Sequence, residues 1–192
     1  MIGKIIVVEG CEATGKSTLA KKLVEKYDGI YFHCPSGILD LTKKIYGIIS
    51  EYGMDERTKK LLMMATHIEN INTMNDLKNS GEVVICDRSI LSAYAYQHFS
   101  LVQFQEFSKN VELPTLNYDF AFVLTACIDT IKDRLETRGK DVGDTYFLAN
   151  IERIINKYNN DFDVFYPAAH KLNTTIKDEN IIFKKVIQII EN

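Results

Sequence analysis

The segment Gly10-Cys11-Glu12-Ala13-Thr14-Gly15-Lys16-Ser17 matches the pattern GxxxxGK[ST]. It follows the apolar, β-branched run Ile2–Val8 and precedes a segment from Lys16 to about Tyr27, whose apolar residues recur on one helical face. A strand, a glycine-containing loop and a helix in this order form the setting in which this pattern binds phosphate. We therefore expect main-chain N–H groups of the loop to surround phosphate oxygens, at the positive end of the helix dipole.

The residue types of the motif suit ATP and Mg²⁺. Glycines at both ends let the loop wrap closely around phosphates. The Lys16 ammonium would reach the β- and γ-phosphates, and the Ser17 hydroxyl would ligate Mg²⁺. A chance turn containing glycine is the alternative, and the strand–loop–helix context makes it the weaker one. The candidate ATP-binding residues of the loop are Gly10, Cys11, Glu12, Ala13, Thr14, Gly15, Lys16, Ser17 and Thr18.

Asp87 and Arg88 follow a second buried-strand run, Val83–Cys86. In open α/β sheets, ligands bind at the carboxyl ends of the strands. Asp87 would hold Mg²⁺ through water, opposite Ser17, and the rigid fork of Arg88 would grip an anionic acceptor. The alternative is an exposed acid at a strand end beside an ordinary surface arginine.

Ser92 and Tyr96 lie four residues apart on the helix that would follow, so they share one face. Both would then line the pocket for the acceptor. An equally good interpretation is that Tyr94 and Tyr96 pack in the core, and the sequence leaves the two open.

Arg134 and Arg138 also lie four residues apart on one helix face, and Lys140 follows after Gly139. Like charges at this spacing repel, and a bound anion would relieve the repulsion. We expect the polar stretch Gly139–Asp144 to belong to a lid, at about residues 138–146, that closes over nucleotide. Arg134 would contact ATP. A solvated basic face is the alternative.

Composition favours one cytoplasmic domain spanning residues 1–192. The chain is 46% hydrophobic and carries a formal net charge of −3, which gives no general attraction to nucleic acid or to an anionic membrane. Its four cysteines are scattered, and its four histidines have no metal-ligand spacing. The first apolar run is too short for a signal peptide, and no later segment is apolar enough to span a bilayer.

Strands and helices are expected to alternate along the chain. The expected strands are Ile2–Val8, Ile30–His33, Val83–Cys86, Phe120–Leu124 and a weak one at Leu172–Ile176. The expected helices are Lys16–Tyr27, Leu39–Ile49, Glu56–Asn79, one from about Ser89, Asp129–Arg138, one near Thr145–Asn160 and one at the C-terminus. This alternation predicts a three-layer α/β/α P-loop NTPase fold with a parallel sheet of about five strands.

With these motifs the chain resembles the thymidylate kinases, a family of P-loop nucleoside monophosphate kinases, over nearly its whole length. Three segments carry the resemblance: Val8–Thr18, Asp87–Gln97 with its Asp-Arg pair, and Leu113–Gly139, which ends in Arg-Leu-Glu-Thr-Arg-Gly. Ala13 stands where a basic residue would sit in the loop, while arginines precede the lid. That arrangement is similar to the bacterial pattern, in which the lid supplies the catalytic arginine.

The resemblance implies a role for several residues. Lys16, Arg88 and Arg138 would be catalytic, with Arg88 on the acceptor phosphate and Arg138 on the transferring phosphoryl group. Glu12 would contact the deoxyribose 3′-hydroxyl. The family is generally homodimeric. The implied acceptor-binding residues are Glu12, His33, Pro35, Met63, His67, Arg88, Ser92 and Tyr96.

Three of these positions differ from the usual family residues, and so does Ala93, which stands where the family has a base-contacting Asn or Thr. His33-Cys34-Pro35 replaces an arginine before a Phe-Pro pair, and Met63 and His67 align with a base-stacking Phe and an Arg. The acceptor would therefore be dTMP or a related deoxynucleoside monophosphate.

A deoxynucleoside kinase is the nearest alternative, because Asp87-Arg88-Ser89 also resembles the motif of that family. A nucleoside 5′-hydroxyl benefits from a general base, which that family supplies as a Glu after the second strand. No Asp or Glu occurs between Asp28 and Asp40, where only His33 could substitute. Two further alternatives fit less well. A polynucleotide end kinase would need a broader basic surface than this acidic chain has. An ATP-sensing module would not need the acceptor and lid cations, Arg88 and Arg138.

Overall fold

A parallel sheet of five strands, in the order β2-β3-β1-β4-β5, forms the centre of the computed structural model, which describes residues 3–139, 142–176 and 178–192. The strands are β1 (Lys4–Gly10), β2 (Ile30–His33), β3 (Val83–Asp87), β4 (Phe120–Thr125) and β5 (His170–Asn173). The sheet confirms the predicted fold class. Because β1 and β3 are neighbours, the phosphate-binding loop and Asp87 lie at the same edge.

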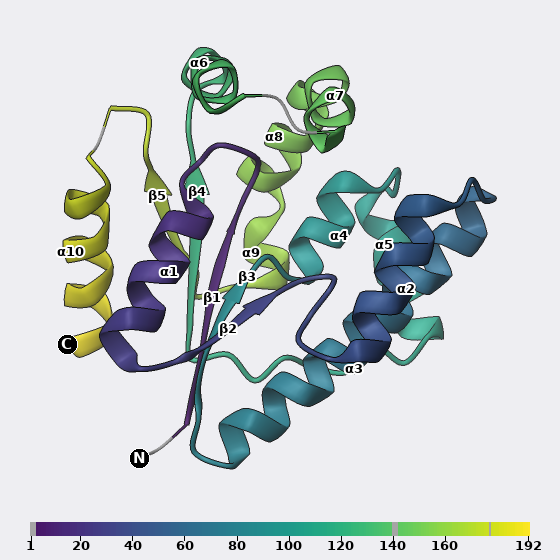
Figure 1. Cartoon of the computed structure of the whole chain (residues 1–192), viewed down its shortest axis with the longest axis horizontal. Helices are drawn as coiled ribbons and strands as arrows, with labels where there is room; N and C mark the ends of the chain where they lie inside the picture. Colours follow the sequence, from purple (N-terminus) through teal and green to yellow (C-terminus); the bar gives the residue numbers. More distant parts are fainter. Residues whose placement is uncertain (1–2, 140–141, 177) are drawn as a thin grey trace.

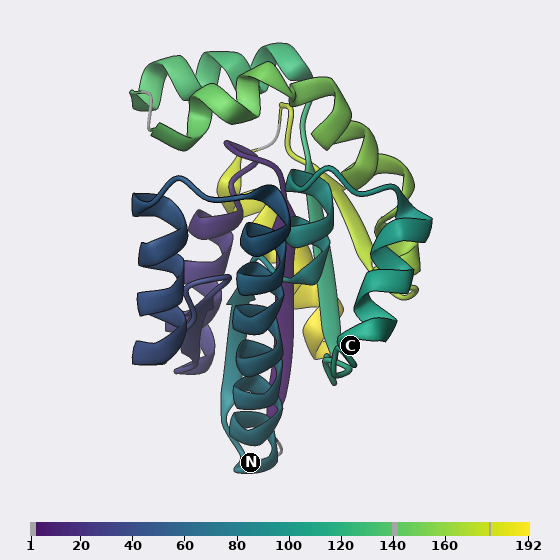
Figure 2. The same cartoon turned by 90° about the vertical axis from the view of Figure 1, so that its right-hand side faces the viewer.

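Helices cover both faces of this sheet (Figure 1). In chain order they are α1 (Lys16–Tyr27), α2 (Asp40–Glu51), α3 (Glu56–Asn79), α4 (Ile90–Tyr96), α5 (Leu101–Asn110), α6 (Ile128–Arg138), α7 (Val142–Ala149), α8 (Ile151–Asn160), α9 (Phe162–Phe165) and α10 (Glu179–Glu191). In Figure 2, α6 and α7 lie across the end of the sheet at which the strands stop. They therefore roof the edge where ligands bind in open α/β sheets.

Two hydrophobic cores, one on each face, follow from the alternation of side chains along β1. Ile6 and Val8 pack with residues of α1 and α10. Ile5 and Val7 pack on the other face, with residues of α3, α4 and α8. All four side chains have no exposed area, as the continuous apolar run predicts for a strand with helices on both sides. Packing on both faces holds β1 in place, and it thereby fixes the position at which the phosphate-binding loop begins.

Three expectations about helices need correction. The single helix expected near Thr145–Asn160 is two, because the chain breaks between α7 and α8 at Asn150. Helix α5 was not expected, although Ser100 and Gln103 form a capping box at its start, a pattern readable in sequence. The four-residue α9 was not expected either. The weak last strand begins earlier than expected, at His170. Among the described residues, no helix is long and apolar enough to cross a membrane.

Candidate active site

The phosphate-binding loop has the backbone conformation that its glycines allow. Gly10 and Gly15 have φ of 143° and 91°, in the region that side chains disfavour. A Cβ on Gly10 would lie 2.4 Å from the carbonyl oxygen of Leu124 on β4, so only glycine fits there. Gly15 is the N-cap residue of α1, whose first residues are Lys16 and Ser17. The loop thus presents a helix N-terminus and main-chain amides to one space, as phosphate binding requires.

Lys16 is buried inside the loop, with 5% of its surface exposed. Its Nζ donates a hydrogen bond to the main-chain oxygen of Cys11 at 2.7 Å. Burial and the neighbouring Arg88 lower the pKa of Lys16 to about 8. The ammonium is therefore held where an anion would stabilise its charge. The Cys11 thiol is buried too, which raises its pKa to about 11, so it stays protonated at neutral pH.

The lowered pKa of Lys16 makes ATP binding sensitive to pH. Below about pH 8 the ammonium is charged and attracts phosphate; above it, binding must first add a proton to the amine. We expect the Kd for ATP to rise about five- to tenfold between pH 7.5 and pH 9, measured by calorimetry. A Lys16→Arg variant, which keeps its charge throughout this range, is the control and should show a flat profile. A flat profile for the parent protein would contradict this assignment.

Asp87 and Ser17 offer oxygen ligands at the open end of the loop. Asp87 is fully buried at the end of β3 and accepts a hydrogen bond from the Tyr31 hydroxyl at 2.7 Å. Burial acts to raise the pKa of Asp87, but Lys16, Tyr31 and Ser17 outweigh it, so the net shift is downward and the carboxylate stays charged. The other oxygen, Oδ1, is buried without a hydrogen-bond partner among the described residues. A carboxylate oxygen left unpaired beside a hydroxyl fits Mg²⁺, which prefers such ligands.

Arg88 projects into the same space from the residue after β3. Its Nη2 donates a hydrogen bond to Glu12 Oε1 at 2.8 Å, and its guanidinium lies 5.0 Å from the centre of the Tyr96 ring. Burial acts to lower the pKa of Arg88, but the charges of Glu12, Tyr158, Glu9 and Asp87 together outweigh it, so the net shift is upward. Glu12 Oε2 is buried without a partner among the described residues. Arg88 therefore stands as a fixed, permanent cation about which an anion can be placed.

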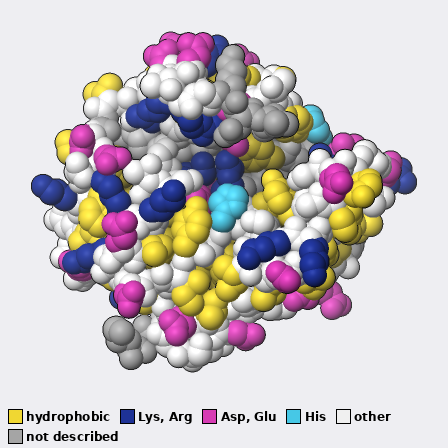
Figure 3. Space-filling view, in the orientation of Figure 1, with side chains coloured by type: hydrophobic (Ala, Val, Ile, Leu, Met, Phe, Trp, Pro, Cys, Tyr) yellow, Lys and Arg dark blue, Asp and Glu magenta, His cyan; other side chains and the backbone are white. Residues whose placement is uncertain are grey.

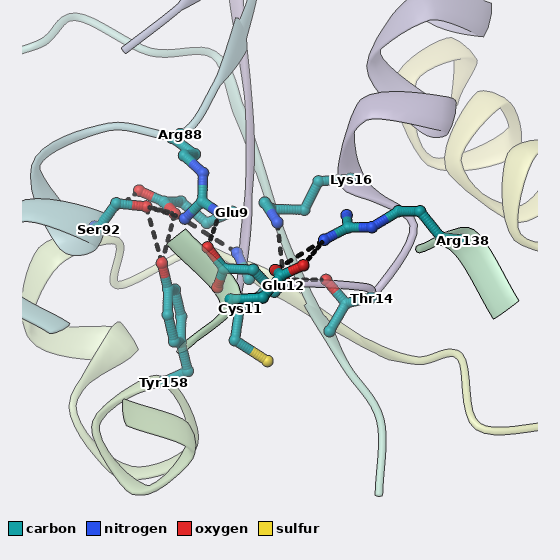
Figure 4. Close-up of polar contacts among 11 residues, drawn as sticks. Glu9, Cys11, Glu12, Thr14, Lys16, Arg88, Ser92, Arg138 and Tyr158 are labelled. Carbon is teal, nitrogen blue, oxygen red and sulfur yellow. Dashed lines mark hydrogen bonds and ion pairs between the residues drawn. The ribbon is translucent and has the colours of Figure 1, made fainter. Parts of the chain in front are cut away.

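One cavity of about 630 Å³ joins the loop to His33 and Arg88, and to the end of α6. In Figure 3, Lys and Arg side chains gather around a hollow near the top centre of the face. The predicted site residues that line the cavity are Glu12, Ala13, Thr14, Gly15, Lys16, Ser17, Thr18, His33, Arg88, Arg134 and Arg138. The cavity thus brings together all three residues expected to be catalytic. Figure 4 shows these three cations around the loop.

The two arginines of α6 have different partners. Arg134 donates to the main-chain oxygens of Ala13 and Thr174, at 3.1 and 2.6 Å, so it ties the loop to the segment after β5. Arg138 donates to both carboxylate oxygens of Asp144, at 2.7 and 2.9 Å, and joins the end of α6 to α7. Lys140 and Asp141, which belong to the expected lid, lie outside the described residues.

The expected acceptor residues divide between the cavity and its surroundings. His33 lies at the end of β2 in the cavity, and burial lowers the pKa of its imidazole. His67 of α3 is buried and its side chain contacts Cys34. Met63, one turn before His67, is partly buried, and the Pro35 oxygen accepts a hydrogen bond from Asn70 at 2.7 Å. Pro35, Met63 and His67 therefore do not line this cavity.

Ser92 and Tyr96 share one face of α4, as their spacing predicts. Tyr96 lies beneath Arg88, and Ser92 Oγ lies 3.5 Å from an Arg88 nitrogen. The Ser92 hydroxyl donates to Glu9 at 2.8 Å and also meets the Tyr158 hydroxyl at 2.7 Å. Tyr94, in contrast, packs among aromatic rings of the core. The sequence analysis assigns no role to Glu9. Its place in a buried strand could have drawn attention to it, because a buried carboxylate needs hydrogen-bond donors inside the protein.

Comparisons with known proteins give the same family as the site. The family model described as thymidylate kinase matches residues 8–176. A probable thymidylate kinase of Methanocaldococcus jannaschii is 34% identical over 134 residues, which cover 69% of this chain and 70% of that protein. The thymidylate kinase of Caldicellulosiruptor saccharolyticus is 28% identical and is matched over 98% of its length by the whole of this chain.

Solved structures support the fold. The thymidylate kinase of Candida albicans superposes with a TM-score of 0.76 at 21% identity, covering 98% of this chain and 91% of that one. The thymidylate kinase of Ehrlichia chaffeensis gives a TM-score of 0.71 at 20% identity, covering 99% of each chain. The family match over most of the sequence, with the phosphate-binding loop and Asp87-Arg88 at one edge of the sheet, shows that this chain belongs to the thymidylate kinase family.

Proposed function

We propose that this protein transfers the γ-phosphoryl group of ATP to dTMP or a closely related deoxynucleoside monophosphate. The observation that carries the proposal is the placement of Arg88. This buried cation shares one cavity with Lys16 of the phosphate-binding loop, yet comes from a different strand. A site for two anionic groups, one on each cation, is what a kinase with a phosphate acceptor needs.

Each cation has a separate task in this mechanism. Lys16 and the amides of the loop hold the β- and γ-phosphates, and Arg88 holds the acceptor phosphate so that its oxygen faces the γ-phosphorus. Arg138 offsets the charge of the transferring group. Ser17 and Asp87 would hold Mg²⁺, which would supply positive charge beside the phosphates. A phosphate oxygen is already an anionic nucleophile, so no side chain has to take a proton from it.

The alternative, phosphorylation of a nucleoside 5′-hydroxyl, is not favoured. That reaction benefits from a general base near the hydroxyl. Of the carboxylates near the cavity, Glu12 is paired with Arg88 and Glu179 with Lys22, and Asp87 accepts from Tyr31 and sits beside Ser17. His33 has a lowered pKa and is the only residue of β2 that lines the cavity. The family match also points to the monophosphate.

A panel of acceptors tests the proposed function. The protein is incubated with ATP and Mg²⁺ and with each nucleoside or nucleoside monophosphate in turn, and ADP is measured. We expect kcat/KM for the preferred deoxynucleoside monophosphate to exceed that for its parent nucleoside by at least about a hundredfold, because only the monophosphate can pair with Arg88. Equal or faster phosphorylation of the nucleoside would overturn the proposal.

We further propose that residues 1–192 act as one domain and that segment 138–146 acts as a lid. The Arg138–Asp144 pair supports this, because it joins the first residue of that segment, which lines the cavity, to Asp144 further along it. Opening and closing of the cavity would then accompany movement of one short unit.

The protein is also proposed to form homodimers in the cytoplasm, as the family resemblance implies. An exposed apolar row supports a second copy as partner: Leu41, Ile48 and Tyr52 of α2 and its C-cap are 47–60% exposed, and Leu61 of α3, the helix that packs against α2, is 53% exposed. An unpaired row of this kind marks an interaction surface. Light scattering would give the mass of a dimer. The four cysteines are unpaired, which suits a reducing compartment.

A further inference from the structure

Glu9, the residue before the phosphate-binding loop, is fully buried and lies at the centre of a polar network. Its carboxylate accepts hydrogen bonds from the main-chain N–H of Ser89 at 2.7 Å and of Ser92 at 3.1 Å. It also accepts from the hydroxyls of Ser89, Ser92 and Tyr158. With the main-chain N–H of Gly10 at 3.4 Å, six donors converge on this one side chain, which lines no part of the large cavity. Figure 4 shows Glu9 with Ser92 and Tyr158 beside Arg88.

Glu9 caps α4 from outside the helix. Ser89 is the N-cap residue, but its side chain makes no capping bond to its own helix. Instead, the carboxylate of Glu9 receives the N–H of Ser89 and the N–H of Ser92 in the first turn, two groups that a helix leaves unpaired. A negative charge at this end also suits the helix dipole. The start of α4 is therefore fixed by β1, the strand that carries the phosphate-binding loop.

Two tyrosines extend the network to the opposite side of the site. Tyr158 lies on α8, and Tyr166 follows α9 and contacts the Ser89 hydroxyl. Burial, and next the charge of Glu9, raise the pKa of both phenols, so both remain protonated and able to donate. The carboxylate consequently fastens three parts of the fold at one point.

The residue between β3 and this network is Arg88. Its φ is +69°, a left-handed conformation that is costly for a residue with a side chain. Its N–H donates to Val8 on β1 at 3.0 Å, while the next residue, Ser89, is held by Glu9. Contacts on both sides thus keep the backbone of Arg88 in a conformation that it would otherwise leave.

We propose that Glu9 is a positioning residue for the acceptor: it touches no substrate, and it sets the direction of Arg88 and of the Ser92–Tyr96 face of α4. This inference rests on the proposed function, because it concerns the residue that would hold the acceptor phosphate. It separates the roles of neighbouring acids in the sequence Glu9-Gly10-Cys11-Glu12. Glu12 pairs with Arg88 inside the cavity, and Glu9 holds the backbone beneath it.

The variant Glu9→Gln tests this assignment. The amide keeps the size of the side chain but removes its charge, and an NH₂ group in place of one oxygen cannot accept from the Gly10 N–H and makes the Ser92 and Tyr158 hydroxyls turn to accept, so part of the network is lost. We expect the KM for dTMP to rise about tenfold and kcat to fall, while the Kd for ATP changes less than twofold. A control, Glu25→Gln on the exposed face of α1, removes the same charge and should change neither constant. A lower melting temperature with an unchanged KM for dTMP would overturn the proposal.

A double variant shows whether Glu9 acts through Arg88. If it does, adding Glu9→Gln to Arg88→Ala changes kcat/KM for dTMP less than twofold, since the group being positioned is gone. If the losses of kcat/KM in the two single variants instead multiply in the double variant, the inference is wrong. If Glu9→Gln fails to fold, Ser89→Ala removes only one hydroxyl of the network and should raise the KM for dTMP about threefold; an unchanged KM would again count against it. Parent protein that phosphorylates no monophosphate would instead refute the proposed function.

Discussion

Replacement of Lys16 by Ala lowers kcat/KM for the transfer reaction by about a thousandfold or more and leaves the fold intact. The ammonium lies within the loop and, among the described residues, donates a hydrogen bond only to the Cys11 oxygen, so it is available to phosphate oxygens. In phosphoryl transfer most of the rate comes from positioning and from cations at the transferring group. Removal of a charge that burial disfavours, as the lowered pKa of Lys16 shows, should not lower the melting temperature.

The measurement is steady-state kinetics together with thermal unfolding. Lys22→Ala is a matched control, because Lys22 also lines the cavity but is occupied by Glu179 at 2.9 Å and Asn180 at 2.7 Å. We expect that control to retain activity within about threefold. Turnover of Lys16→Ala within a few-fold of the parent protein would refute the assignment of the phosphate-binding loop.

The sequence predicts the parts of this fold that are encoded locally. The run at β1 and the periodicity of α1 are both continuous and strong, and the structure has α1 at the residues expected. The break at Asn150 was missed because the apolar pattern continues from α7 into α8, and only packing of α8 against α4 and β4 shows that the direction changes. Such a break depends on distant contacts that a periodic pattern does not contain.

The site shows the same division. The loop could be predicted from one motif, because its chemistry lies in consecutive residues. Glu9 could not, since its partners Ser89, Ser92 and Tyr158 lie 80 to 149 positions away and only the fold brings them together. Likewise, the spacing of Arg134 and Arg138 indicates a shared anion, whereas the structure gives them separate partners in Thr174 and Asp144.

Replacement of Arg88 by Ala lowers kcat/KM for the acceptor by about a thousandfold while the Kd for ATP changes less than about threefold. Only 16% of the Arg88 side chain is exposed, so the site is largely shielded from water. In the variant, the acceptor phosphate loses a charge-assisted hydrogen bond that is strong in such surroundings. Lys16 and the loop amides remain in place, so ATP is still held. Acceptor kinetics and calorimetry with ATP separate the two effects, at a temperature below the melting transition of the variant.

Two further variants separate the charge of Arg88 from its shape. Arg88→Ala leaves the Glu12 carboxylate half-buried without its partner, which by itself repels a phosphate, so the double variant Arg88→Ala, Glu12→Gln removes that repulsion. Arg88→Lys keeps a charge but lacks the planar fork that spans Glu12 and a phosphate at once. We expect acceptor kcat/KM in Arg88→Lys to recover only part of the loss, by about tenfold. Full recovery of kcat/KM in Arg88→Lys would mean that the charge alone suffices. An unchanged acceptor KM and kcat in Arg88→Ala would show that Arg88 does not belong to the acceptor site, because no steady-state constant would then depend on its cation.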